Sequence, residues 1–314
     1  MEGINNLGAT CAINSLIQIF CRNKRLRTII LNSTVSPTSF TGELREVIDL
    51  ICNQNKSLHP AKFLDCFYRT FNGIFNRFEQ IDINELWFYV FDKINEETSQ
   101  PSLLDLKEIR NMNDEHNYKI DIYNNNKTSE LLKLVQGSFI NIIHCNLCNH
   151  KSYSFEPFIN IPLDIDNDKH LTVADLISGF ITDEFREADA WRCDNCHHNC
   201  SYIKTNRIWK IPKVLFLSLN RFKDLNKNNK EIIINDDINF TKGTVLSLDN
   251  NCKFELQAVG LHFGGLQGGH YTSACNMNNG NYHHYNDNDI AVINNQEIKS
   301  ILNKNGYLII YENN

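Results

Sequence analysis

The sequence lacks three features that would narrow its class at once: a long hydrophobic run, an excess of positive charge and an internal repeat. Because no run approaches the roughly 18 consecutive apolar residues of a membrane span, we expect no membrane association. The formal net charge of -6 argues against a nucleic-acid partner and suits a basic protein partner better. What remains is a globular protein of ordinary hydrophobic and charged content.

The pattern of a secretory leader is also missing, since the first residues are polar and the apolar positions after them are periodic rather than continuous. We therefore expect a cytoplasmic or nuclear protein. In those compartments the eleven cysteines are thiols, metal ligands or a nucleophile rather than disulfides. The cysteines are thus the main candidates for a functional site.

The pattern of apolar residues changes near residue 137. Before it, apolar positions recur at helical spacing, apart from a polar, Asn-rich stretch at 98–128 that we expect to be an irregular insertion or loop. After it come short β-rich runs bounded by Gly, Pro, Asn and Asp, and helical patterns return at 171–181 and 296–302. Helices first and strands later predict an α+β fold with a cleft between lobes.

Two C-x-x-C pairs form the most specific local motif. They are Cys145 with Cys148 and Cys193 with Cys196. Each pair can present two thiolates to one tetrahedral ion, so the two pairs predict one structural zinc ion. The segment 149–192 between them is longer than the spacer of a compact zinc ribbon, so we expect the pairs at the tips of separate hairpins.

Two alternatives to that zinc site remain open. The four cysteines are reduced thiols in a lobe that has lost its metal, or a nearby side chain (His197, His198 or Cys200) replaces one ligand. A zinc-dependent hydrolase is disfavoured, because four thiolates leave no open position for water.

The stretch GINNLGATCAINSLIQIF, residues 3–20, places Cys11 at or just before the start of a predicted helix. Ile13, Leu16, Ile17 and Phe20 recur at the spacing of an amphipathic helix. A helix N-terminus favours an anion, so a cysteine there is biased toward the nucleophilic thiolate. The alternative is a small buried apolar residue.

A nucleophilic cysteine needs a base and a group that orients the base. His270 in GGLQGGHYTSA is a candidate, because the glycines before it let the backbone approach a ligand. The segment YHHYNDND then offers Asn286, Asp287 and Asp289 to orient the imidazole. The alternative is that these polar residues only form a turn.

The order of these motifs resembles the ubiquitin-specific proteases (USPs), a family of papain-like cysteine proteases that are deubiquitinases. The matching blocks span residues 3–312 in the family's order: GINNLGATCAINSLIQ, QIDINEL, the two cysteine pairs, VGLHFGGLQGGHYTSA, YHHYNDNDI and GYLIIYE. Two positions depart from the family pattern, because Ala12 stands where an aromatic residue is usual and Tyr282 where Trp is usual. Neither departure removes a reacting group.

The resemblance implies a single catalytic domain over 1–314 with the papain-like fold of the USP type. In that fold a helical thumb covers about 1–136 with the polar insertion at 98–128. Zinc-binding β fingers and adjoining segments cover about 137–206, and a β-rich palm covers 207–314. One structural zinc ion is implied at the four cysteines, and we expect a monomer.

The resemblance also implies roles for individual residues. Cys11 is the nucleophile, His270 is the general base and then acid, and Asn286 is the third member, with Asp287 beside it sharing that work. The remaining roles are the oxyanion-hole donor Asn6, the substrate-binding residues Gln80, Asp82 and Tyr271, and the zinc ligands Cys145, Cys148, Cys193 and Cys196.

The implied activity is hydrolysis of the isopeptide or peptide bond after the C-terminal Gly of ubiquitin, through a Cys11 thioester. Ubiquitin and ubiquitinated proteins are then the partners. Two alternatives stay open: a protease for another ubiquitin-like modifier, and a catalytically silent ubiquitin-binding scaffold.

Overall fold

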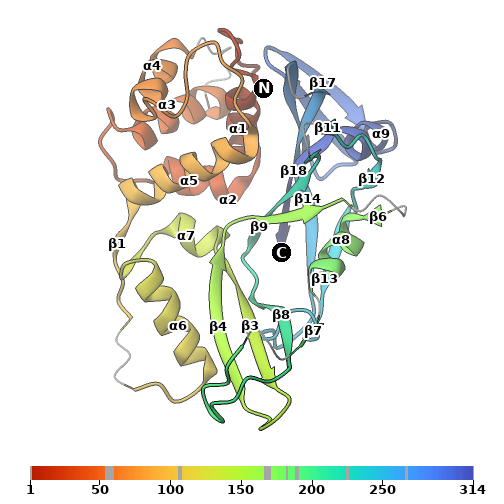
Figure 1. The fold of residues 1–314 in the computed structure, drawn as a ribbon. Helices are drawn as coiled ribbons and strands as arrows, with labels where there is room; N and C mark the ends of the chain where they lie inside the picture. Colours follow the sequence, from red (N-terminus) through yellow and green to blue (C-terminus); the bar gives the residue numbers. More distant parts are fainter. Residues whose placement is uncertain are drawn as a thin grey trace.

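The structure is a computed structural model that describes residues 2–53, 60–104, 108–165, 171–181, 183–187, 191–223, 226–265 and 268–313. Most of the helices gather on one side and a large sheet lies on the other, and a smaller sheet extends away from their junction (Figure 1). This mixed architecture confirms the predicted α+β class. Among the described residues, no helix is both long and apolar enough to cross a membrane.

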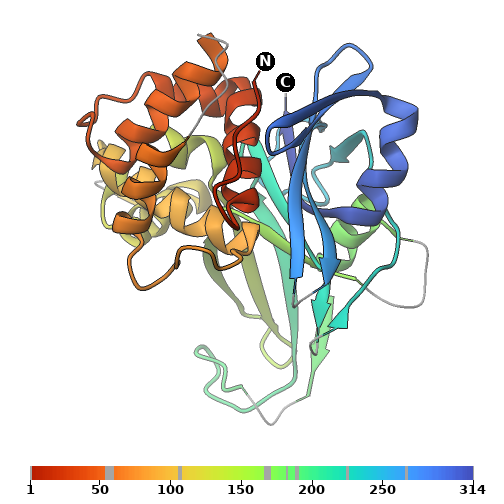
Figure 2. The ribbon, with the colours of Figure 1, turned by 90° about the horizontal axis from the view of Figure 1, so that it is seen from above.

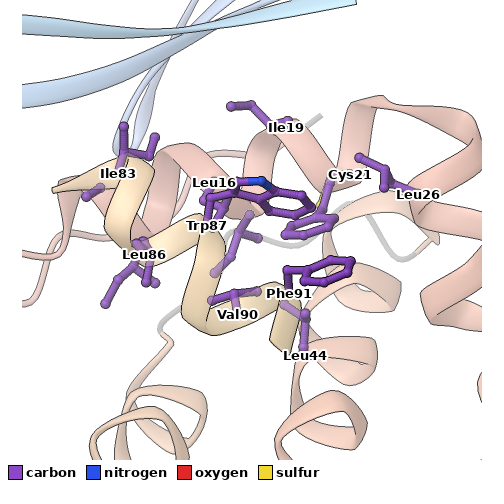
Figure 3. Close-up of a cluster of buried hydrophobic side chains, with 14 of the residues drawn as sticks. Leu16, Ile19, Cys21, Leu26, Leu44, Ile83, Leu86, Trp87, Val90 and Phe91 are labelled. Carbon is purple, nitrogen blue, oxygen red and sulfur yellow. The ribbon is translucent and has the colours of Figure 1, made fainter. Parts of the chain in front are cut away.

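The helical side is built from the first part of the chain. Its main helices are α1 (Cys11–Arg22), α2 (Lys24–Leu31), α3 (Phe40–Asn53), α4 (Ala61–Thr70) and α5 (Ile83–Thr98). Figure 3 shows Trp87 of α5 packed among apolar side chains of this side, Leu16 of α1 among them. Trp87 also stacks on Phe216 with ring centroids 4.0 Å apart, which joins the helices to the sheet.

Helix α1 is buried on every side rather than along one stripe. The predicted apolar positions are buried, but so are the polar residues Asn14, Ser15 and Gln18. The reason is that α1 lies between α3 and α5 on one side and the large sheet on the other, as Figure 2 shows. Asn14 and Gln18 use their amides to hold the N-terminal segment, donating to the carbonyls of Ile4 and Glu2.

The large sheet has eight strands in the order β17-β16-β15-β14-β18-β9-β5, with β13 pairing to β14. The strands are β5 (Ile161–Asp164), β9 (Val214–Asn220), β13 (Asp237–Phe240), β14 (Cys252–Gly265), β15 (Gly268–Asn276), β16 (Asn281–Asn286), β17 (Asp289–Asn294) and β18 (Gly306–Asn313). Neighbours are antiparallel except β5, which runs parallel to β9. Strand β15 faces α1, so the two ends of the chain meet at this contact.

The smaller sheet has four antiparallel strands in the order β4-β3-β8-β7. They are β3 (Gly137–Cys145), β4 (Lys151–Phe158), β7 (Asp183–Arg186) and β8 (Tyr202–Lys210). Both cysteine pairs lie at one end of this sheet. Cys145 is the last residue of β3 and pairs with Tyr202, the first residue of β8, and the second cysteine pair precedes β8. The segment 137–206 also contributes β5 to the large sheet.

The stretch 98–128 is more ordered than its composition predicts, and the expectation of an irregular insertion is wrong for its described part. It forms β1 (Gln100–Pro101), α6 (Met112–Tyr123) and β2 (Lys127–Thr128), and β1 pairs with β2. Asn111 caps α6 by accepting from the Asp114 N–H, and acidic residues follow in the first turn. Asparagine therefore serves as a helix cap here rather than as loop filler. Residues 105–107 lie outside the described part.

The remaining elements lie between the strands and helices already described. They are α7 (Glu130–Val135), β6 (Leu171–Thr172), α8 (Val173–Phe180), β10 (Phe222–Lys223), β11 (Asn226–Lys227), β12 (Ile232–Ile233) and α9 (Asn295–Asn305). The helices expected at 171–181 and 296–302 are thus present as α8 and α9.

Candidate active site and metal centre

Cys11 is the first residue of α1, directly after the N-cap residue Thr10, and its side chain is buried. Burial raises the pKa of the Cys11 thiol, and the nearby Asp287 carboxylate raises it further. Hydrogen bonds from backbone N–H groups, that of Tyr271 foremost, act in the opposite direction but do not reverse the shift. The backbone N–H groups at the start of the helix do lower the pKa of this thiol, as expected, but desolvation outweighs them and the net shift is upward.

Asn6 organises the turn that leads into α1. Its Oδ1 accepts from the N–H groups of Gly8 and Thr10, at 3.0 and 3.2 Å, and from the Thr10 hydroxyl. Gly8 has a φ of 99°, so this tight turn requires a residue that tolerates the left-handed region. The Nδ2 group of Asn6 donates to Asp287 Oδ2 at 2.9 Å, which links the turn to the far end of the chain.

His270 lies on β15 and contacts Asn286 on β16. Its Nε2 is 2.6 Å from Asn286 Oδ1, and this distance is that of a hydrogen bond in which the ring nitrogen donates. With the proton on Nε2, Nδ1 is the ring nitrogen that can take a proton from another group. The carboxylate of Asp287 is farther away, with Oδ2 at 3.9 Å from Nε2. Asn286 is thus the residue that contacts the imidazole directly.

Asp287 has a different function, because it holds three parts of the chain together. Its Oδ1 accepts from Asn14 Nδ2 at 2.8 Å and its Oδ2 from Asn6 Nδ2. Its backbone carbonyl accepts from the Ile4 N–H at 2.9 Å, and its own φ is 53°. Sequence reasoning missed Asn14, although its position three residues after Cys11 on a helix places both on one face.

The structure brings Cys11 and His270 to the same place without joining them by a hydrogen bond between the described side chains. The thiol lies against the backbone of Tyr271, the residue after His270, because α1 packs on β15. Hydrogen bonds between catalytic groups are often long before substrate binds, so this arrangement is compatible with proton transfer from Cys11 to His270.

Gln80 fixes the backbone immediately before His270. Its Nε2 donates to the Gly269 carbonyl at 2.7 Å, and its Oε1 accepts from the Gly269 N–H at 3.0 Å. Gly269 cannot carry a side chain, because a Cβ there would lie 2.1 Å from Nε2 of the buried His262. In the structure Gln80 thus positions His270. The substrate-binding role of Gln80 stays a prediction.

Asp82 and Tyr271 are bound to each other rather than presented to solvent. Asp82 Oδ1 caps α5 by accepting from the Asn84 and Glu85 N–H groups. Its Oδ2 accepts from the hydroxyls of Tyr271 at 3.1 Å and Tyr307 at 2.6 Å. Burial raises the pKa of both tyrosines, which remain donors to this carboxylate. The substrate-binding roles of Asp82 and Tyr271 stay predictions.

The four cysteines of the two C-x-x-C pairs come together as a candidate metal centre. The sulfur atoms of Cys145, Cys148, Cys193 and Cys196 all lie within 4.8 Å of one another. Thiolates on one tetrahedral zinc are about 3.8 Å apart, given a Zn–S length of about 2.3 Å, so the four residues fit that ion. The positions of these four described residues thus confirm that the two pairs can hold a metal ion. Their sulfur atoms would move little on binding it.

Comparisons with known proteins agree with this arrangement. The family model described as ubiquitin carboxyl-terminal hydrolase matches residues 2–311. The chain is 25% identical to "Ubiquitin carboxyl-terminal hydrolase 4" of Saccharomyces cerevisiae, over 98% of this chain and 39% of that protein. It is 24% identical to the human "Ubiquitin carboxyl-terminal hydrolase 2", over 99% of this chain and 55% of the relative. The chain therefore spans about half or less of these relatives.

Solved structures show the same fold. One is a SAGA DUB module of Ubp8, Sgf11, Sus1 and Sgf73 bound to monoubiquitin, with a TM-score of 0.80 and 21% identity over all of this chain and 69% of that one. Another is the Ubp8/Sgf11/Sus1/Sgf73 module bound to ubiquitin aldehyde, with a TM-score of 0.80, 22% identity and coverage of all of this chain and 70% of that one. The papain-like fold of the USP type is thereby confirmed. The chain belongs to the ubiquitin carboxyl-terminal hydrolase family, as its resemblance to the ubiquitin-specific proteases predicted.

Proposed function

We propose that the chain is a thiol-dependent deubiquitinase that hydrolyses the bond after the C-terminal Gly of ubiquitin. The observation that carries the proposal is the assembly, from opposite ends of the chain, of Cys11 on α1 beside the hydrogen-bonded pair His270 and Asn286. Family membership and the ubiquitin-bound modules of similar fold support the choice of ubiquitin as substrate. All three reacting groups are present, which argues against a catalytically silent scaffold.

The first chemical step is attack by Cys11 on the carbonyl carbon of the terminal Gly. Because burial raises the pKa of the thiol, His270 removes the proton through Nδ1 as Sγ attacks. Asn286 holds the opposite ring nitrogen and so leaves Nδ1 to accept the proton. His270 then returns the proton to the leaving lysine amine, and a thioester to Cys11 remains.

Water resolves the thioester in the second step. His270 accepts a proton from the water, the hydroxyl adds to the thioester carbonyl, and the Cys11 thiol leaves with the proton. In both steps the carbonyl oxygen carries negative charge, which we expect Asn6 Nδ2 and the N–H groups at the start of α1 to stabilise. Asn6 uses one Nδ2 hydrogen on Asp287, and the other is available to the oxyanion. One such donor is typically worth about 3 kcal/mol in the transition state.

A ubiquitin probe with an electrophile at its C-terminus tests the proposal. The wild-type chain is expected to form one covalent adduct, and Cys11→Ser is expected to form none. Cys252→Ser serves as the matched control, because this half-buried thiol starts β14 away from His270 and is expected to leave labelling unchanged. Adduct formation that survives Cys11→Ser, or no adduct with the wild type, contradicts the proposal.

The same assay decides between ubiquitin and other modifiers. Parallel probes built on different ubiquitin-like modifiers are expected to react more slowly than the ubiquitin probe. Faster reaction with another modifier would transfer the proposed chemistry to that substrate without changing the roles of Cys11 and His270.

We also propose that the ion at the four-cysteine centre is zinc, with a structural role. Four thiolates close a tetrahedral shell and leave no position for a reacting water, and the centre lies at the tip of the smaller sheet, away from Cys11. When bound, zinc would hold the turn after β3 to the turn before β8. Two further expectations, a monomer and a cytoplasmic or nuclear location, stay predictions.

A further inference from the structure

A fifth thiol, that of Cys200, lies against the four-cysteine centre. Its sulfur is 3.3 Å from the sulfur of Cys145, closer than Cys148 is to Cys193, where the sulfurs are 3.6 Å apart. Both separations are far longer than the roughly 2.0 Å of a disulfide bond and close to the spacing of two thiolates on one metal ion. Cys200 belongs to neither C-x-x-C pair, so motif spacing does not assign it.

Cys200 is buried together with two of the proposed ligands, although it lies outside both C-x-x-C pairs. The buried core at the tip of the smaller sheet consists of Cys145, Cys193 and Cys200, while Cys148 and Cys196 lie half-buried at its margin. Soft metal ions prefer sulfur ligands, so a buried core of three cysteines suits the binding of such an ion better than it suits purely apolar packing. Cys200 therefore stands on the inner side of the centre.

The backbone holds Cys200 in this position on both sides. Its own N–H donates to the Trp191 carbonyl, and the carbonyl of the next residue, Ser201, accepts from the Asn146 N–H. These bonds tie Cys200 to the base of the turn that carries Cys193 and to the end of β3. The backbone at Cys200 is thus held beside the end of β3 by bonds that do not involve Cys196.

We propose that Cys200 is a reserve ligand of the metal centre and takes the position of Cys196 when that thiol is lost. Cys200 lies outside the group of four sulfurs that are all within 4.8 Å of one another, but its sulfur is 3.3 Å from that of Cys145. The exchange therefore needs a shift of the Cys200 side chain toward Cys148 and Cys193, while Cys145, Cys148 and Cys193 keep their places. Cys196 is the ligand to be exchanged, since it sits at the half-buried tip of the same turn. The inference rests on the proposed metal site and names a fifth residue of it.

The experiment compares Cys196→Ser, Cys200→Ser and the double variant with the wild type and with Cys252→Ser. The readouts are zinc per chain after dialysis and the ligand-field spectrum of the cobalt-substituted protein, which distinguishes four thiolates from three. Each single variant is expected to keep one ion and a four-thiolate spectrum. The double variant keeps three thiolates at most, and its zinc affinity is expected to fall about 100-fold below that of Cys196→Ser.

The results that overturn the inference are distinguishable from failure of the metal site itself. A Cys196→Ser chain with a three-thiolate spectrum, or with zinc affinity equal to that of the double variant, shows that Cys200 does not replace the ligand. A Cys196→Ser chain that does not fold in the presence of zinc has the same meaning, provided Cys252→Ser folds. A wild-type chain without bound zinc overturns the proposed metal site as well, whereas labelling at Cys11 tests the catalytic proposal separately.

Discussion

The chain uses cysteine in two regions that are built on opposite principles. Around Cys11 a single thiol is set among amides and a carboxylate, and its neighbours come from the two ends of the chain. At the tip of the smaller sheet several sulfurs touch one another and form the local core themselves. One region keeps a single thiol for reaction, and the other brings several thiols together to stabilise the local fold.

The hydrophobic support behind the two regions differs as strongly. Helix α1, which carries Cys11, belongs to a large cluster that joins the helices to the sheet through contacts such as Trp87 on Phe216. The tip has three buried cysteines with Trp191 packed against them. Loss of the Cys11 thiol should therefore cost reaction rate, whereas loss of the bound ion at the tip should cost stability.

The largest expected effect is that of Cys11→Ser on catalysis. Hydrolysis of a fluorogenic ubiquitin C-terminal amide should fall by about 10,000-fold or more, because the nucleophile is lost. The free energy of unfolding in urea should stay within about 1 kcal/mol of the wild type, since the large core behind α1 is unchanged. A destabilisation above that range would show that the two regions are less distinct than the packing indicates.

Removal of the metal is expected to have the second largest effect, and it lowers the free energy of unfolding rather than the reaction rate. If zinc is present at 1,000 times its Kd, its loss to a strong chelator lowers the free energy of unfolding by about 4 kcal/mol. Thermal unfolding with and without chelator measures the change, and Cys145→Ser should abolish the chelator's effect. Cys11→Ser is the matched control and should respond to chelator like the wild type.

The two regions also differ in how far the sequence predicts them. The metal centre follows from local spacing, because each C-x-x-C pair places two thiols in one turn and only the meeting of the pairs depends on the fold. The active site has no comparable local motif. Residue chemistry made Cys11, His270 and Asn286 candidates with open alternatives, and the resemblance to a family was needed to choose among them.

What the sequence did not predict depends on contacts between distant residues. Asn14 and Tyr307 look like ordinary helix and strand positions, yet they bind Asp287 and Asp82 across the fold. The pKa of Cys11 was expected to fall at a helix N-terminus and instead rises, because the depth of burial is set by β15 packing on α1. Helix α6 was missed because an Asn-rich composition does not reveal which asparagine is a cap.

A third prediction separates the two residues beside His270. Asn286→Ala should lower hydrolysis by about 30-fold, or about 2 kcal/mol, because the imidazole loses its orienting acceptor, and the exposed position should leave stability unchanged. Asp287→Ala should lower the free energy of unfolding by about 2 kcal/mol, because the amides of Asn6 and Asn14 lose their acceptor. Hydrolysis rates and urea unfolding measure both, and the reverse assignment of effects would make Asp287 the orienting residue.

The last expected effect is absent at neutral pH and appears only in acid, and it concerns His262, which lies beneath Gly269 in the catalytic region. Burial, with help from the Lys227 charge, lowers its pKa from 6.5 to about 4. The unfolded chain therefore takes up a proton that the folded chain refuses, and stability falls as the pH drops from about 6.5 to about 4. His262→Gln should flatten this part of the pH profile whatever its effect at neutral pH. Urea unfolding with chelator present removes any contribution from acid release of zinc, and equal slopes for the two proteins would exclude His262 as the source.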